Sequence, residues 1–164
     1  MKEEIMKQKS FYETDNFIVA VPLKPHIPRE DGGHIWIMAK EKYFNDRTEF
    51  EPQYAIEVMR LTMLLGEAMK KGMKERGIEI EIINYQENGN WSFLDGTKPV
   101  FHIHLYGRTR NAKSQKWGEA LYFPNPTSSF YDNFQALNDE DIEAIKNEIY
   151  KLESAEKYDV SNWK

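Results

Sequence analysis

Cysteine is absent from this sequence of 164 residues. Without thiols the chain can form neither a disulfide nor a thiolate-ligated metal site, and this composition suits a reducing compartment, so we expect a cytoplasmic protein. An excess of basic residues is absent too, because 27 aspartates and glutamates outnumber 22 lysines and arginines and give a formal net charge of -5. A nucleic-acid polymer normally binds a basic surface, so we expect none as a partner.

Long hydrophobic runs are also missing. No apolar stretch approaches the ~20 residues of a membrane-spanning helix, and the polar residues 1–10 lack the apolar centre of a signal peptide. We therefore expect no membrane partner. The length fits one domain, and the pattern predicts a flexible N-terminus at 1–10, a single domain at 11–153 and a C-terminal tail at 154–164.

The order of the hydrophobic patterns predicts an α+β fold. Alternating or β-branched and aromatic segments indicate five strands, at 11–14, 17–21, 34–40, 78–84 and 100–108. Apolar residues at helical spacing indicate a long helix from Pro52 to about Arg76 and a C-terminal helix from Asp139 to about Leu152. Strands that flank one long helix and precede another favour a largely antiparallel sheet of about five strands.

The long helix carries more apolar surface than one sheet needs. Ile56, Leu61 and Leu64 widen its apolar stripe beyond a single face. If this surface is uncovered, it forms a patch of the kind that marks an interface. We therefore expect a homodimer.

The stretch 100–108 is the most informative part of the chain. In an extended conformation Phe101, Ile103 and Leu105 share one apolar face. His102 and His104 share the other face, about 7 Å apart. Two imidazoles on one face of a strand are either polar residues of a solvated surface or part of a functional site.

The two remaining histidines lie in the first quarter of the chain. His34 follows a glycine pair at the start of a predicted strand, so we expect it to be a structural hydrogen-bonding residue. His26 lies among Pro22, Pro25 and Pro28, so we expect a solvated loop residue.

From residue 11 to about residue 110 the chain resembles the histidine triad (HIT) superfamily of nucleotide hydrolases and transferases. The family's hallmark is a strand of alternating histidines followed by proline or glycine and arginine, and residues 100–108 fit it with the sequence VFHIHLYGR. The Gly33-His34 pair before an upstream strand and the long helix between the two strands fit as well. The resemblance implies a HIT-like fold, a nucleotide or nucleotide conjugate as ligand, no cofactor, and the subunit pairing that HIT proteins of this size commonly show.

The register of the motif decides the implied roles. If Arg108 sets it, His102 occupies the position of the family's nucleophile and His104 that of its third histidine. Thr97 then lies five residues before the nucleophile, where the family often has a serine or threonine that contacts phosphate. The rival register makes His104 the nucleophile and Tyr106 the third member, but it matches neither Arg108 nor Thr97.

Three positions depart from the family pattern. Val100 replaces the first histidine, and Lys42 stands near the place where many members have a further histidine. The acidic residue that many members use on the ribose hydroxyls is not evident, because Pro22 falls near its position. The first departure bears on proton relay, and the last bears on nucleotide preference.

The chemistry of these residues is coherent. A neutral imidazole is a competent nucleophile near pH 7, because its unperturbed pKa is about 6.5. Attack on an α-phosphorus would give a nucleotidyl-histidine, and a second imidazole could carry positive charge and stabilise the phosphoryl oxygens. Thr97, Asn84 and Asn88 are the candidate substrate-binding residues, although each also fits ordinary turn chemistry.

Two other functions remain open. The chain could be a binding module that keeps a nucleotide pocket and has lost turnover with the first histidine. His102 and His104 could instead supply two ligands of a metal site. Such sites need a third and a fourth ligand, and none lies at an obvious spacing, so we predict no bound metal.

Overall fold

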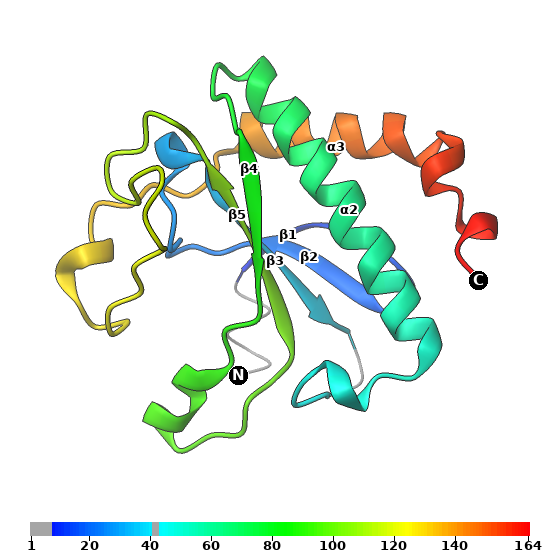
Figure 1. The fold of residues 1–164 in the computed structure, drawn as a ribbon, viewed down its shortest axis with the longest axis horizontal. Helices are drawn as coiled ribbons and strands as arrows, with labels where there is room; N and C mark the ends of the chain where they lie inside the picture. Colours follow the sequence, from blue (N-terminus) through cyan, green and yellow to red (C-terminus); the bar gives the residue numbers. More distant parts are fainter. Residues whose placement is uncertain (1–7, 41–42) are drawn as a thin grey trace.

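The computed structural model describes residues 8–40 and 43–164, which form a five-stranded antiparallel sheet in the order β1-β2-β3-β5-β4 with two long helices (Figure 1). The strands are β1 (Lys9–Glu13), β2 (Phe17–Val21), β3 (His34–Ala39), β4 (Ile82–Gln86) and β5 (His102–Arg108), and the helices are α2 (Pro52–Glu75) and α3 (Asp139–Glu153). The predicted α+β fold is confirmed. Lys42 and residues 1–7 lie outside the described residues.

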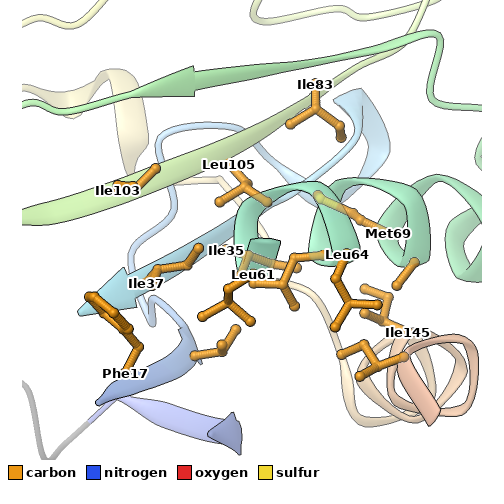
Figure 2. Close-up of a cluster of buried hydrophobic side chains, with 14 of the residues drawn as sticks. Phe17, Ile35, Ile37, Leu61, Leu64, Met69, Ile83, Ile103, Leu105 and Ile145 are labelled. Atoms are coloured by element: carbon orange, nitrogen blue, oxygen red, sulfur yellow. The ribbon is translucent and has the colours of Figure 1, made fainter. Parts of the chain in front are cut away.

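Alternation along the strands separates an apolar face of the sheet from a polar one. Phe101, Ile103 and Leu105 are at most 4% exposed on the apolar face, as predicted. The core contains Phe17, Ile35, Ile37, Ile103 and Leu105 from the sheet, Leu61, Leu64 and Met69 from α2, and Ile145 from α3 (Figure 2). Both helices therefore cover one face and leave the face with the histidines to the loops.

Helix α2 is buried on two sides, because it packs against both the sheet and α3. Leu61 and Leu64 are fully buried and Ile56 is half-buried, so the prediction that these residues are left over for a partner subunit is wrong. The large apolar side chains of α2 that remain exposed are Met59 and Met63, at 49% and 36%.

The fourth strand begins and ends later than predicted. It spans Ile82–Gln86, whereas the sequence pattern favours 78–84. Gly77 has a φ of 78° and ends α2, and the N–H of Ile78 donates back to a carbonyl in the last turns of the helix. The extension to Gln86 follows from pairing with β5, where Gln86 lies opposite His104.

Two glycines bring the start of β3 against the end of β5. Gly32 has a φ of 126°, and a Cβ on it would lie 2.5 Å from the backbone of Gly107. The N–H of Gly107 donates to the carbonyl of Gly33 at 3.0 Å. Only residues without a side chain fit this crossing, and it fixes the following residue, His34, beside β5.

After α3 the chain returns to α2. Tyr158 is buried, and its hydroxyl donates to the Glu67 carboxylate at 2.8 Å, while Arg60 donates to the Tyr158 carbonyl at 2.9 Å. None of the described helices combines the length and the apolar composition that crossing a bilayer requires.

Candidate functional site

Three strands place eight side chains on the polar face, because paired residues of antiparallel strands point to the same side of a sheet. They are His102, His104 and Tyr106 of β5, opposite Met38, Trp36 and His34 of β3, with Gln86 and Asn84 of β4 opposite His104 and Tyr106. Three of the four histidines therefore share one surface.

His102 is half-buried at the start of β5. Its Nδ1 lies 2.7 Å from the carbonyl oxygen of Val100, and only an N–H can bond there, so Nε2 carries the lone pair. Burial lowers the pKa of His102, and the Val100 carbonyl and the charge of Glu87 act in the opposite direction. The ring is therefore neutral at pH 7, with Nε2 available as a nucleophile.

His104 lies next to His34, and both rings are at most 2% exposed. Nδ1 of His104 is 2.8 Å from Nε2 of His34, and Nε2 of His104 is buried with no hydrogen-bond partner among the described residues. Burial, reinforced by the neighbouring histidines, holds the pKa of both rings well below 6.5. Burial therefore favours the neutral form of His104 in the free protein, and a positive charge on His104 during the reaction stays a prediction.

His34 is a hydrogen-bonding centre, as predicted. Its Nδ1 accepts from the backbone N–H of His26 at 3.1 Å, and its Nε2 lies 2.7 Å from the donating Nε1 of Trp36. Trp36 is half-buried, and its ring centroid lies 5.8 Å from that of His102 and 5.6 Å from that of His104.

The prediction that His26 is solvated is wrong. Its Nδ1 lies 2.8 Å from the Tyr106 hydroxyl, and burial lowers its pKa to about 4. Six rings surround it at centroid distances of 4.9 to 5.9 Å: His34, Trp91, His104, Tyr106, Phe123 and Tyr131. The flanking prolines were a signal of a restricted loop, but their spacing does not specify which face of the sheet the loop covers.

The three candidate substrate-binding residues take different places. The amide of Asn88 donates to the Tyr106 hydroxyl at 3.1 Å, so Asn88 belongs to the histidine surface. Oδ1 of Asn84 accepts from Arg108 at 3.3 Å. Thr97 is exposed, and its hydroxyl donates at 3.2 Å to a carbonyl within its own turn. Substrate binding by these residues stays a prediction.

Gln86 is a further member of the site that sequence reasoning missed. It lies directly opposite His104 in the sheet, and its side-chain oxygen is 3.5 Å from the amide nitrogen of Asn88. The predicted strand ended at Asn84, so Gln86 was assigned to a loop. A strand two residues longer would have brought it onto the histidine face.

Residues 109–137, which we call the roof, form a long loop beside the sheet (Figure 1), and Phe123 and Tyr131 of this loop lie against His26. The buried carboxylate of Asp31 accepts three backbone N–H groups of residues 113–115 at 2.8 to 2.9 Å. The side-chain amide of Gln115 donates to the His26 carbonyl at 3.3 Å. Arg108, which set the register of the motif, donates to two roof carbonyls at 2.7 and 3.1 Å. The roof is thereby fastened to the loop that carries His26.

His26, His34 and His104 also form a group with metal-ligating atoms. One ring nitrogen from each lies within 4.8 Å of the others. Around a tetrahedral zinc ion such nitrogens are about 3.4 Å apart, so small side-chain shifts would be needed. Sequence spacing missed this group, because its members come from one loop and from two strands that are distant in the chain.

Solved structures with the same fold include three histidine triad or Hit-like proteins. A hypothetical histidine triad nucleotide-binding protein from Sulfolobus tokodaii has a TM-score of 0.56 at 16% identity, over 93% of this chain and 90% of that chain. A Zn-bound histidine triad family protein from Mycobacterium smegmatis has a TM-score of 0.55 at 19% identity, over 91% and 88%. A Hit-like protein involved in cell-cycle regulation from Bartonella henselae, with an unknown ligand, has a TM-score of 0.54 at 17% identity, over 86% of each chain.

In sequence, no family model matches the chain, and no curated protein matches it either. The structural likeness covers most of the chain and extends beyond the 11–110 region that carries the sequence resemblance. At these identities it concerns the fold and not the activity. The chain therefore has the fold of the histidine triad superfamily, as its HIT-like sequence motif predicts.

Proposed function

We propose that the protein binds a nucleotide or nucleotide conjugate and attacks its α-phosphate with His102, as a hydrolase or nucleotidyl transferase. The observation that carries the proposal is the hydrogen bond from Nδ1 of His102 to the Val100 carbonyl. It leaves a neutral Nε2 lone pair on a half-buried surface beside His104. One protein with this fold is named as nucleotide-binding, which supports the ligand class.

The proposed reaction has two displacements at phosphorus. Nε2 of His102 forms a bond to the α-phosphorus, and the bond from phosphorus to the leaving oxygen breaks, with its electron pair going to the leaving group. The ring then carries a positive charge, which the Val100 carbonyl stabilises through the Nδ1–H. A water molecule or another acceptor attacks the phosphorus, the P–N bond breaks, and the proton of the attacking hydroxyl is released.

Two alternatives have observations in their favour. Val100 in place of the first histidine favours a binding module without turnover. The group His26, His34 and His104 favours a site for a divalent metal ion such as zinc. We further propose a cytoplasmic location, on the cysteine-free composition.

Substrates with an acidic leaving group are expected to be preferred. With Val100 in the chain, one member of the family's polar array is missing, so proton delivery to a basic leaving group is weakened. Phosphoanhydrides release phosphate or nucleotide, which need little protonation, whereas phosphoramidates release an amine that needs a proton. We expect kcat/KM to be higher for a dinucleoside polyphosphate than for a nucleoside phosphoramidate, and turnover of the anhydride tests the proposed function itself.

The matched variant for this measurement is Val100→His. It is expected to raise kcat/KM for the phosphoramidate more than for the anhydride. Saturable nucleotide binding without any product would favour the binding module. An equal gain on both substrates would mean that another group already supplies the proton.

We also propose a homodimer that forms through β4 and α2. β4 is an edge strand of the sheet, and Ile82 and Tyr85 on it are 52% and 47% exposed. A cavity of about 630 Å³ lies beside Tyr85 and is lined by Tyr85, Met59 and Met63 among other residues. In this proposal the apolar surface that a second copy contacts consists of these exposed side chains, and not of Leu61 and Leu64, which are buried.

Light scattering at micromolar concentration is expected to give about twice the 19.4 kDa mass of one chain. Met63→Glu should shift the mass to that of the monomer, because a charge would be buried in the interface. Tyr150→Glu is the matched control, since Tyr150 is 54% exposed on α3, away from this surface. A monomeric mass for the unmodified protein would rule the dimer out.

A further inference from the structure

The side-chain amide of Asn88 is held by two residues of the histidine surface. Its nitrogen donates to the Tyr106 hydroxyl at 3.1 Å and, over a longer distance of 3.5 Å, to the side-chain oxygen of Gln86. An amide nitrogen carries two hydrogens, so the two acceptors use both. The Oδ1 of Asn88 has no hydrogen-bond partner among the described residues, and the residue is only half-buried. Towards a ligand, Asn88 therefore presents an acceptor and no donor.

Tyr106 fixes the direction in which this amide faces. Tyr106 is fully buried, and its hydroxyl lies 2.8 Å from Nδ1 of His26. With the Asn88 nitrogen as donor, the hydroxyl gives its single hydrogen to His26 and accepts from Asn88, so all three groups are satisfied. In the reversed amide, Oδ1 of Asn88 would face the side-chain oxygen of Gln86, and two acceptors would repel each other. The hydrogen bonds thus favour the orientation in which Oδ1 is directed away from Tyr106 and Gln86.

This acceptor lies close to the proposed nucleophile. Both partners of the Asn88 amide are neighbours of His104, because Gln86 pairs with His104 across the sheet and the Tyr106 ring stacks on it at 5.2 Å. The ring centroid of His104 is in turn 4.6 Å from that of His102. The Asn88 amide is therefore separated from His102 by about one side chain.

Other acceptors in this part of the molecule are already in use. Oδ1 of Asn84 accepts from an arginine, and the Asp31 carboxylate accepts three backbone N–H groups. The carboxylate of Glu87 is paired with Arg47, and both residues line the cavity beside α2. Oδ1 of Asn88 is thus the side-chain oxygen that remains for a ligand at the histidine surface.

The direction of the amide decides which part of a nucleotide it can bind. Ionised phosphate oxygens are acceptors, so an acceptor cannot bond to them. The ribose hydroxyls are donors, and the ribose follows the α-phosphate directly through its 5′ oxygen and carbon. The amino groups of the base are donors as well, but they are farther from the phosphorus. An acceptor one side chain away from the nucleophile fits the ribose.

We propose that Oδ1 of Asn88 accepts a hydrogen bond from a ribose hydroxyl of the nucleotide, and that Tyr106 is the positioning residue that holds the amide for this contact. The inference rests on the proposed function and adds a preference for ribonucleotides over deoxyribonucleotides. It assigns the ribose contact to a neutral amide in a chain that has Pro22 near the position of the family's acidic residue.

The test measures equilibrium binding of adenosine 5′-monophosphate and of its 2′-deoxy and 3′-deoxy forms by calorimetry. The unmodified protein is expected to bind the ribonucleotide about 10-fold more tightly than one of the deoxy forms, because that form leaves Oδ1 without its donor. Asn88→Ala should remove this preference by weakening the binding of the ribonucleotide alone. Equal affinities for all three forms in the unmodified protein would overturn the inference.

Asn88→Asp separates an acceptor from a donor at this position. Aspartate keeps an acceptor oxygen and loses both N–H groups, so the ratio between the ribonucleotide and the deoxy form should persist. The affinity for all three forms should fall together, because the new charge repels the phosphate. A ratio that falls to one, as in Asn88→Ala, would mean that the N–H groups face the ligand, and it would contradict the proposed contact.

Tyr106→Phe removes only the hydroxyl and should lower the ratio, because the amide of Asn88 is then free to turn. Combining it with Asn88→Ala should lower the ratio no further, since both changes act on one contact. Tyr131→Phe is the matched control: its ring also borders His26, at 5.7 Å, but its hydroxyl donates to the Pro124 carbonyl, so the ratio should stay unchanged. An equal loss of affinity for all three forms in Tyr106→Phe would show that Tyr106 only supports the fold, and its positioning role would be wrong.

Turnover separates this inference from the proposed function. If a dinucleoside polyphosphate is hydrolysed and His102→Asn abolishes the reaction, but the ribonucleotide and deoxy forms bind equally, the role of Asn88 is wrong and the proposed function stands. A ribose preference without turnover supports the role of Asn88 and favours the binding module. If none of the three monophosphates binds, both proposals fail.

Discussion

Replacing His102 with asparagine is expected to lower kcat/KM for a dinucleoside polyphosphate on the order of 10³-fold or more. Asparagine fills similar space but offers no lone pair that can attack phosphorus, and a covalent mechanism fails as a unit when its nucleophile is lost. The free energy of unfolding should change by about 1 kcal/mol, because the side chain is half-buried and makes one hydrogen bond to the backbone. Steady-state kinetics and denaturant unfolding measure the two quantities.

The covalent intermediate offers a second readout for the same variant. After an alkaline quench, the intact mass of the unmodified protein should include a fraction increased by one nucleotidyl group, and the fraction should vanish in His102→Asn. His104→Asn is the matched comparison, and it should retain the adduct while lowering the rate. If His104→Asn instead loses the adduct and His102→Asn keeps it, the rival register with His104 as nucleophile is right.

The free energy of unfolding is expected to fall steeply as the pH drops below 6.5. Burial lowers the pKa of His26 to about 4 and holds the pKa of His34 and His104 well below 6.5. In the unfolded chain the same groups titrate near 6.5. The unfolded state therefore binds more protons than the folded state below this pH, and acid stabilises it relative to the folded state. The stability associated with these neutral rings is present above pH 6.5 and is lost as the pH falls toward 4.

The size of this effect follows from the number of protons. Each histidine contributes about 1.4 kcal/mol per pH unit once the pH lies below its unfolded pKa, so three give a slope of about 4 kcal/mol per unit. A domain of ordinary stability, about 5–15 kcal/mol, would lose much of it by pH 5. Urea unfolding at a series of pH values between 7.5 and 4.5 measures the slope.

His26→Phe is the matched variant, because it keeps a ring in the surrounding aromatic array and should reduce the slope by about one third. Carboxylates ordinarily titrate at about pH 4, and three hydrogen bonds lower the pKa of Glu67 to about 2. The window between pH 6.5 and 5 therefore reports the histidines. A flat profile in that window would mean that the folded protein accepts protons on these rings, and it would contradict their neutrality.

The elements that the sequence predicts well are those with complete local signals. At the start of α3 the side chain of Asn138 accepts from the backbone N–H of Asp141, and the side chain of Asp141 accepts from the backbone N–H of Asn138. Both residues of this capping box can be read from the sequence. In β5 the strict alternation of Phe101, Ile103 and Leu105 indicates the buried face. The bounds of β4 were predicted wrongly. Its start depends on the cap of α2, and its end depends on pairing with a strand about twenty residues later in the chain.

The sequence predicts the candidate site best along β5. His102 and His104 follow from alternation within one strand. Trp36 and Gln86 become neighbours of His104 through cross-strand register, which no local pattern specifies. His26 enters through the course of a proline-rich loop that the roof holds in place. A single sequence carries no signal for such a contact between distant loops.

The three N–H groups that Asp31 accepts bear on the order in which the molecule folds. They join positions 82 to 84 residues apart, and the bond between His34 and His104 spans 70 residues. Closing such long loops costs chain entropy. The contacts that form when β3 pairs with β5 are what offset this cost. We therefore expect the histidine face to take shape after the helices and the hairpin of β1 and β2, whose contacts are local. Because the roof has no strand or α-helix of its own, we expect local openings to release it before the sheet, and such openings would control access to the histidines.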